Sequence, residues 1–236
     1  LAHLVTETKT YRATIRLGAS TTTDDAEGDI TSRTDTTDVT DTLIDAAIAQ
    51  LTGDIMQKPA AVSAIKIDGK RAHERVRDGE TVDIPARPVT VHRFDVLDRR
   101  SVDGYIDLDV DVFCSSGTYI RSLARDLGNA LGVGGHLTAL RRTTVGPFDL
   151  THARTLEELE DNPQLSLTLD QALAVSFPIL RVSGEEGHKL AMGQWLEPRG
   201  LKGIHAAVTP DGQAVALVKE KGKRLATVFV ARPSTL

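Results

Sequence analysis

The sequence predicts a mixed α+β fold followed by a small β-rich module. Residues 105–113 alternate apolar and polar side chains, as a half-buried strand does. Directly after this strand, Ile120, Leu123, Leu127 and Leu131 recur at helical spacing. Near the C-terminus, glycines separate several short apolar segments. Strands with an intervening helix, and then a β-rich tail, indicate one α+β domain and a second, smaller one.

The other elements follow from the same patterns in chain order. Lys9–Leu17 alternates as a strand, and Thr40 precedes residues 41–51 as the cap of a helix. Residues 57–85 have a mixed pattern, with a short basic helix expected around residues 71–77. Further strands are expected at residues 87–97, 136–145, 204–209, 214–219 and 225–230.

The composition is that of a folded protein without a membrane span. Of 236 residues, 40% are hydrophobic and 26% are charged, which is enough to build a core. No apolar run approaches the length of a membrane span and no secretory signal is visible, so we expect a cytoplasmic location. The single cysteine, Cys114, excludes a disulfide framework, and no Cys/His cluster has zinc spacing. We expect Cys114 to be a buried small hydrophobe, and we expect no metal.

The net charge of −5 is unevenly distributed along the chain. Residues 19–54 hold nine acidic side chains against Arg33 alone, whereas residues 199–236 hold seven basic against two acidic ones. Residues 55–100 also carry a basic surplus, ten against seven. The basic regions are able to follow a phosphate backbone, although ordinary solvated faces explain such charge runs equally well.

The segment CSSGTYIR, residues 114–121, joins the strand to the helix and carries the most chemistry. Its small hydroxyl residues Ser115, Ser116 and Thr118 are expected to cap the helix. Tyr119 and Arg121 then fall in the first helical turn, where free N–H groups favour a phosphate or carboxylate. The plain alternative is a capped surface helix on which Arg121 makes a solvent-exposed salt bridge.

Six motifs in this chain occur in the order and at the approximate spacing of one known family. They are KTYRATIRLG at 9–18, TDDAEG at 23–28, VSAIK at 62–66, ARP at 86–88, CSSGTYIR at 114–121 with LARDLG behind it, and GGHLTALRR at 134–142. The chain thereby resembles the TruB-type tRNA pseudouridine synthases, and its actinobacterial branch most closely. The resemblance covers essentially all 236 residues.

One motif of the resembled family does not occur in this sequence. The family carries its catalytic aspartate in GHxGxLDPxAxG, upstream of the strand that begins here at Lys9. We expect that an N-terminal segment of several tens of residues is missing, since the chain starts at Leu1 in mid-pattern. The alternative is that Asp24, Asp25 or Asp126 is the nucleophile. We expect the loop with Asp24 and Asp25 to be solvated, which disfavours that alternative.

The resemblance implies roles for three side chains in the pocket. Tyr11 matches the tyrosine that stacks on the target base and is a candidate for proton transfer at C5, and Tyr119 matches the second pocket tyrosine. Arg121 matches the arginine that pairs with the catalytic aspartate. Either tyrosine is alternatively a plain sheet aromatic with its hydroxyl at the surface.

The resemblance also implies contacts around the pocket. Leu140 corresponds to an apolar pocket residue, and Arg141 is expected with Arg142 at an RNA-facing rim. Lys66 and Arg87 are expected to contact backbone phosphates. At His73 the family often has an aromatic residue, so the RNA contact expected there is in doubt.

The resemblance implies the pseudouridine synthase fold, with a mixed, largely antiparallel sheet. Residues 1–176 would form the catalytic domain, with a thumb-like insertion at about 57–87, and residues 177–236 a PUA-like RNA-binding domain. The implied activity is isomerisation of uridine 55 in the T-loop of tRNA, contacting T-loop and T-arm, without cofactor or metal and as a monomer. The rival interpretation is a noncatalytic RNA-binding or tRNA-remodelling protein, which would keep the groove but have no nucleophile.

Overall fold

The fold is taken from a computed structural model that describes residues 8–60, 66–67, 70–71 and 84–233. The chain divides into two compact units, Leu1–Gly146 and Pro147–Leu236. This division falls well before residue 176, where the sequence analysis places the end of the catalytic domain, and that boundary stays a prediction. Among the described residues, no helix is long and apolar enough to cross a membrane.

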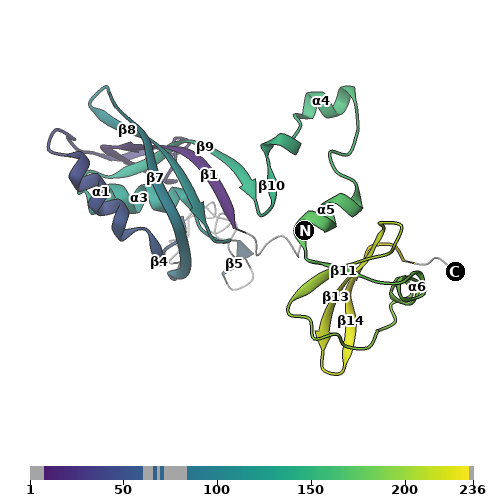
Figure 1. Cartoon of the computed structure of the whole chain (residues 1–236). Helices are drawn as coiled ribbons and strands as arrows, with labels where there is room; N and C mark the ends of the chain where they lie inside the picture. Colours follow the sequence, from purple (N-terminus) through teal and green to yellow (C-terminus); the bar gives the residue numbers. More distant parts are fainter. Residues whose placement is uncertain (1–7, 61–65, 68–69, 72–83, 234–236) are drawn as a thin grey trace. The chain divides into compact units, whose positions relative to one another are not determined.

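The first unit is built on an antiparallel sheet (Figure 1). Its strands run in the order β9-β1-β8-β7-β4, and every neighbouring pair is antiparallel. Their bounds are β1 Lys9–Leu17, β4 Gly53–Gln57, β7 Arg87–Val102, β8 Tyr105–Cys114 and β9 Gly135–Val145. The largely antiparallel sheet and the strand positions predicted from the sequence are confirmed, although β7 runs further than expected.

Two helices cover one face of this sheet. They are α1 (Asp41–Gln50), capped by the Thr40 side chain as predicted, and α3 (Ile120–Ala130). Alternate residues of β1, Ala13, Ile15 and Leu17, are buried in one core with Leu123 and Leu127 of α3. The alternation seen in the sequence therefore marks the face of each strand that the helices cover.

The opposite face of the sheet is charged. Arg16 pairs with Asp107 at 2.8 Å, and Arg93 pairs with Asp111 at 2.5 Å across neighbouring strands. These pairs occupy the side chains that point away from the helices.

Four short strands of this unit lie outside the main sheet. β2 (Ala19–Thr21) pairs with β3 (Ile30–Arg33), and β5 (Lys66–Ile67) pairs with β6 (Lys70–Arg71). Arg71 therefore lies in a strand and not in the basic helix expected around 71–77. The remainder of that expected helix lies outside the described residues.

A backbone contact sets the distance between α3 and β9. A Cβ atom on Gly128 would lie 2.1 Å from the backbone of Gly134 and of Gly135. The Gly128 carbonyl also accepts hydrogen bonds from the N–H groups of Val133 and Gly134, both at 3.0 Å. The glycines of LARDLG and GGHLTALRR thus let the helix approach the start of β9 without an intervening side chain.

The second unit contains a small four-stranded sheet of order β11-β12-β13-β14. The strands are β11 Ile179–Arg181, β12 Ile204–Val208, β13 Ala214–Lys221 and β14 Arg224–Val230, and β11 pairs parallel with β12. The unit also includes β10 (Phe148–Asp149), a short 3₁₀ turn at Leu150–His152, α4 (Leu156–Asp161), α5 (Leu169–Ser176) and α6 (Gly184–Ala191). Leu190 of α6 packs with Val218 and Leu225 in its core. The predicted β-rich module is confirmed.

Candidate active site

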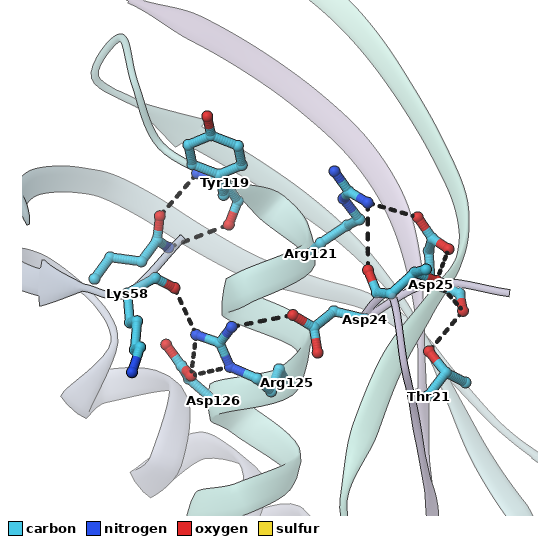
Figure 2. Close-up of polar contacts among 10 residues, drawn as sticks. Thr21, Asp24, Asp25, Lys58, Tyr119, Arg121, Arg125 and Asp126 are labelled. Atoms are coloured by element: carbon cyan, nitrogen blue, oxygen red, sulfur yellow. Dashed lines mark hydrogen bonds and ion pairs between the residues drawn. The ribbon is translucent and has the colours of Figure 1, made fainter. Parts of the chain in front are cut away.

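Tyr119 lies immediately before α3 and is held by a buried glutamine. Its φ of −101° and ψ of 111° are extended, so it is the cap residue and not part of the first turn. The Tyr119 N–H donates to Gln57 Oε1 at 2.8 Å, and Gln57 Nε2 donates to the Tyr119 carbonyl at 3.1 Å. Gln57, at the end of β4, is only 1% exposed. This pair of bonds fixes the backbone at the entrance to the helix (Figure 2).

The predicted capping by hydroxyl side chains is wrong, because other partners use those hydroxyls. The Ser115 hydroxyl accepts from the Thr90 N–H of β7 at 2.9 Å, and Thr118 donates to the Ser115 carbonyl at 2.9 Å. Ser116 accepts from Lys9 Nζ at 3.1 Å. These bonds fix the turn before α3, and none of them caps the first N–H groups of the helix.

Arg121 reaches back to the turn that contains Asp25. Its Nη1 donates to Asp25 Oδ2 at 3.0 Å and to the Thr23 carbonyl at 3.3 Å. Both side chains of the ion pair are largely shielded from solvent. A solvent-exposed salt bridge, the plain alternative for Arg121, is therefore not what the structure shows.

The turn around Asp25 is tightly organised, so the prediction of a solvated loop is wrong. The Thr21 hydroxyl donates to the Asp25 carbonyl at 2.7 Å, and the Thr23 hydroxyl donates to Asp25 Oδ1 at 2.5 Å. Asp24 adopts a left-handed φ of 61°, and its carbonyl accepts from Leu137 N–H of β9 at 3.0 Å. Aspartate tolerates this conformation better than most residues, which explains why it stands there.

Arg125 lies one helical turn beyond Arg121 on α3. It forms a second ion-pair network, which includes Asp24 of the segment that binds Arg121. Its guanidinium contacts Asp24 at 3.0 Å and Asp126 at 2.9 Å, and donates to the Lys58 carbonyl at 2.7 Å. Figure 2 shows both arginines projecting from α3 toward the adjacent Asp24 and Asp25. Burial raises the pKa of Asp24, with Arg125 opposing that rise, and burial likewise raises the pKa of Asp126.

A pocket of about 240 Å³ opens beside Arg121. Its lining combines the Asp25–Glu27 turn and Arg121 with residues 137–140 of β9. Leu140 lines this pocket and is 50% exposed. The structure thus brings two predicted residues, Arg121 and Leu140, into one pocket with Asp25.

Tyr11 lies on the sheet face that the helices cover. It belongs to the same alternating set as Ala13, which pairs with Leu140 across β1 and β9. Burial raises the pKa of the Tyr11 phenol, Cys114 raises it further, and Arg142 lowers it. Among the described residues, the lining of the Arg121 pocket includes neither Tyr11 nor Tyr119.

The remaining predicted residues lie elsewhere. Arg141 follows Leu140 on β9, so the two side chains point to opposite faces of the sheet. Lys66 begins β5, Arg87 begins β7 with an exposed side chain, and His73 lies outside the described residues. Cys114 is fully buried as expected, and burial raises the pKa of its thiol. Nowhere in the described ranges do three or more His, Cys, Asp or Glu side chains form a group that could hold a metal ion.

Sequence reasoning missed two residues of this site. Asp25 belongs to TDDAEG and is expected from the sequence only as a motif residue or a disfavoured nucleophile, whereas the structure makes it the partner of Arg121. Gln57 ends the short strand GDIMQ, where a glutamine gives no signal in the sequence. Only the tertiary contact with Tyr119 identifies it.

Family models cover nearly the whole chain. Residues 1–120 match "TruB family pseudouridylate synthase (N terminal domain)". The chain belongs to the TruB family. Two further models match the rest: residues 121–174 the C-terminal domain of tRNA pseudouridylate synthase B, and residues 177–232 the C-terminal part of tRNA pseudouridine synthase II.

Actinobacterial relatives of this TruB chain share high identity. A tRNA pseudouridine synthase B of Corynebacterium efficiens is 71% identical over 236 residues, covering 100% of this chain and 80% of the relative. A protein of the same name from Nocardia farcinica is 58% identical, covering 100% and 77%. The resemblance to this branch of the family is confirmed.

Solved structures confirm the TruB fold. A Cbf5-Nop10-Gar1 complex contains a chain with a TM-score of 0.68 at 24% identity, covering 98% of this chain and 69% of that one. An H/ACA RNP bound to a substrate RNA containing 2'-deoxyuridine gives 0.67 at 22% identity, covering 98% and 68%. At such identity the similarity concerns the fold alone.

Proposed function

We propose that this chain provides the scaffold and pocket of a tRNA pseudouridine synthase that converts uridine 55 of the T-loop. The observation that supports this most strongly is Arg121, held at 3.0 Å by Asp25 beside an apolar pocket residue, Leu140. Most of the arginine is withdrawn from water yet remains at the pocket wall, so it is able to meet a second carboxylate there. The relatives are named tRNA pseudouridine synthase B, which supports the coarser activity, pseudouridylation of tRNA.

The reaction needs no redox partner. The C1′–N1 bond of the uridine breaks, the uracil turns, and a C1′–C5 bond forms, while a proton leaves C5 and one is gained at N1. A stacked base is out of reach of an enzyme, so the nucleotide must be flipped out and held against an aromatic ring. We assign that stacking to Tyr11, with Tyr119 as the second aromatic of the pocket, and the partner to tRNA through its T-loop and T-arm.

The carboxylate that acts at the sugar is assigned to the aspartate of GHxGxLDPxAxG, which this sequence does not contain. The aspartates near Arg121 already have partners: Asp25 binds Arg121 and Thr23, and Asp24 binds Arg125. Asp126 also contacts Arg125. We therefore propose that none of the three is the nucleophile, that Arg121 orients the motif aspartate, and that the enzyme acts as a monomer in the cytoplasm.

Tritium release from T-loop RNA labelled at C5 of the target uridine tests this proposal. The chain alone should release no tritium, and the chain joined to an N-terminal segment that carries the family motif GHxGxLDPxAxG should release it. Turnover by the chain alone, abolished by Asp25→Asn, would move the nucleophile to Asp25. Tight RNA binding without turnover by the joined protein would instead support the noncatalytic interpretation.

A further inference from the structure

Two arginines of α3 bind three consecutive residues of one turn. Arg121 donates to the Thr23 carbonyl at 3.3 Å and to the Asp25 carboxylate at 3.0 Å. Arg125 donates to the carboxylate of the residue between them, Asp24, also at 3.0 Å. Side chains four residues apart lie on the same face of a helix, so the two guanidiniums repel each other. The carboxylates of the turn offset that repulsion only while the turn keeps this position.

Asp24 has a backbone conformation that its surroundings must hold. Its φ of 61° is left-handed, and a residue other than glycine keeps such a conformation only where other contacts fix it. Two contacts do so: the Asp24 carbonyl accepts from the Leu137 N–H at 3.0 Å, and its carboxylate accepts from Arg125. A change of the Asp24 φ to an ordinary negative value would rotate the next residue, Asp25, away from Arg121. The orientation of Asp25 thus depends on the contacts of its neighbour.

Arg125 is itself fixed by two further acceptors (Figure 2). Its Nη2 donates to the Lys58 carbonyl at 2.7 Å, one residue beyond the end of β4. Its Nε donates to Asp126 Oδ1 at 2.9 Å. A guanidinium presents its donors in a rigid planar fork, which suits several acceptors at fixed angles, whereas a lysine ammonium is a point charge on a flexible stem. The chemistry of this position therefore requires arginine and not merely a cation.

Arg125 does not line the Arg121 pocket. Among the described residues, the pocket lining includes Asp25 and Arg121 but neither Asp24 nor Arg125. The side chains of Arg125 and Asp24 are 21% and 15% exposed, and they line a separate cleft of about 480 Å³. An influence of Arg125 on the pocket therefore has to pass through the peptide that joins Asp24 to Asp25.

We infer that Arg125 is a positioning residue for pseudouridylation: through Asp24 it sets the place at which Asp25 holds Arg121. This inference rests on the proposed function, in which Arg121 orients the motif aspartate, and it adds a residue outside the pocket. The alternative is that Arg125 only stabilises the first unit. In that case the chemical step of the folded protein would not depend on it.

Single-turnover kinetics separate positioning from stability. The amplitude of the reaction reports the folded fraction, and the rate constant reports the geometry of the site. In the joined protein, Arg125→Lys keeps the charge and should lower the rate constant about 10-fold, with the Kd for T-loop RNA nearly unchanged. A lower amplitude with an unchanged rate constant would overturn the inference. Weaker RNA binding with an unchanged rate constant would also overturn it.

A second variant tests whether the effect passes through Asp24. Asp24→Gly removes the carboxylate, while glycine adopts the left-handed conformation without strain. It should lower the rate constant by a similar factor, and Arg125→Lys combined with Asp24→Gly should lower it no further, because both changes remove the same contact. Additive losses would mean that Arg125 acts by another route. If Arg125→Lys unfolds, Asp24→Gly still gives the test.

Arg99→Lys is the matched control. Arg99 of β7 likewise binds a carboxylate, that of Asp41, and a backbone carbonyl, that of Val39 at 2.8 Å. It belongs to the first unit and does not contact the turn at Asp24. Arg99→Lys should therefore lower stability in urea unfolding without changing the single-turnover rate constant.

A measurement without turnover keeps this inference distinct from the isomerase proposal. NMR of the arginine side-chain nitrogens in the chain as it stands follows the Arg121 guanidinium, whose rotation is slowed by its bonds to Asp25 and Thr23. That rotation should become faster in Arg125→Lys and stay unchanged in Arg99→Lys. If the joined protein is inactive and the rotation changes, the isomerase proposal fails while the link from Arg125 to Arg121 stands. An Arg121 signal that Arg125→Lys leaves unchanged would overturn the inference by itself.

Discussion

Gln57 makes both of its side-chain hydrogen bonds to the backbone of Tyr119, 62 residues further along the chain. These two hydrogen bonds connect the end of β4 to the residue before α3. Since Tyr119 makes no side-chain cap hydrogen bond, the Gln57 amide is what fixes the backbone at the start of the helix. Gln57 therefore positions a residue that the sequence identifies only by motif.

Replacing Gln57 should destabilise the first unit. Gln57→Ala leaves the Tyr119 N–H and carbonyl without their buried partner, which costs about 1–3 kcal/mol. Urea unfolding measures the loss, and Gln50→Ala, at an exposed position of α1, is the control. A loss no larger than that of the control would mean that water replaces the glutamine freely.

Arg121→Met should slow the chemical step far more than it weakens tRNA binding. In the active joined protein the cation acts on a carboxylate and not on phosphates, so we expect a loss of about 100-fold or more in single-turnover rate. Arg154→Met, at an exposed arginine of the second unit, should change neither quantity. Weakened binding with an unchanged single-turnover rate would place Arg121 on the RNA backbone.

Arg125→Gln should destabilise the fold in a pH-dependent way. A raised carboxyl pKa means that the folded state holds the proton more tightly than the unfolded state, so stability falls as pH rises through the folded pKa. Arg125 opposes the rise for both Asp24 and Asp126, and its removal raises both pKa values further. We expect a loss of about 1–3 kcal/mol near neutral pH that shrinks in acid, where both carboxyls are protonated.

Adding Asp24→Asn to Arg125→Gln should recover part of that stability, because it removes one unpaired buried charge. Arg121 also lowers the pKa of Asp24, and its own contacts with Asp25 and the Thr23 carbonyl do not involve either substituted side chain. Denaturant unfolding at several pH values measures both effects. A pH-independent loss would show that Arg125 contributes through packing alone.

Replacing the basic residues and replacing Tyr11 should change the salt dependence of RNA binding differently. If Lys66 and Arg141 contact phosphates, replacing either with glutamine should weaken T-loop binding and reduce the salt slope by about one unit. Tyr11→Leu should leave the slope nearly unchanged and abolish turnover of the joined protein, because stacking involves no phosphate. Filter binding at several salt concentrations with single-turnover rates measures both, and the reverse pattern would exchange the assigned roles.

The sequence predicts the secondary structure of this chain better than it predicts the contacts. Strands such as Lys9–Leu17 and the helix capped by Thr40 follow from local periodicity, and the structure reproduces them. The capping of α3 is mispredicted because Ser115 serves Thr90, a partner 25 residues away that local pattern does not reveal. For the same reason the sequence predicts a solvated Asp25, although Arg121, 96 residues later, binds it.

The glycine contact between α3 and β9 determines how the position of Arg121 responds to mutation elsewhere. With backbone against backbone at Gly128, Gly134 and Gly135, the spacing of helix and strand does not depend on any rotamer. Side chains of the surrounding core can then adjust to changes in volume without changing the distance between the sheet and the helix that carries Arg121. Substitutions in the neighbouring core should therefore leave Arg121 in place, whereas a side chain at any of these three glycines should push α3 away from β9.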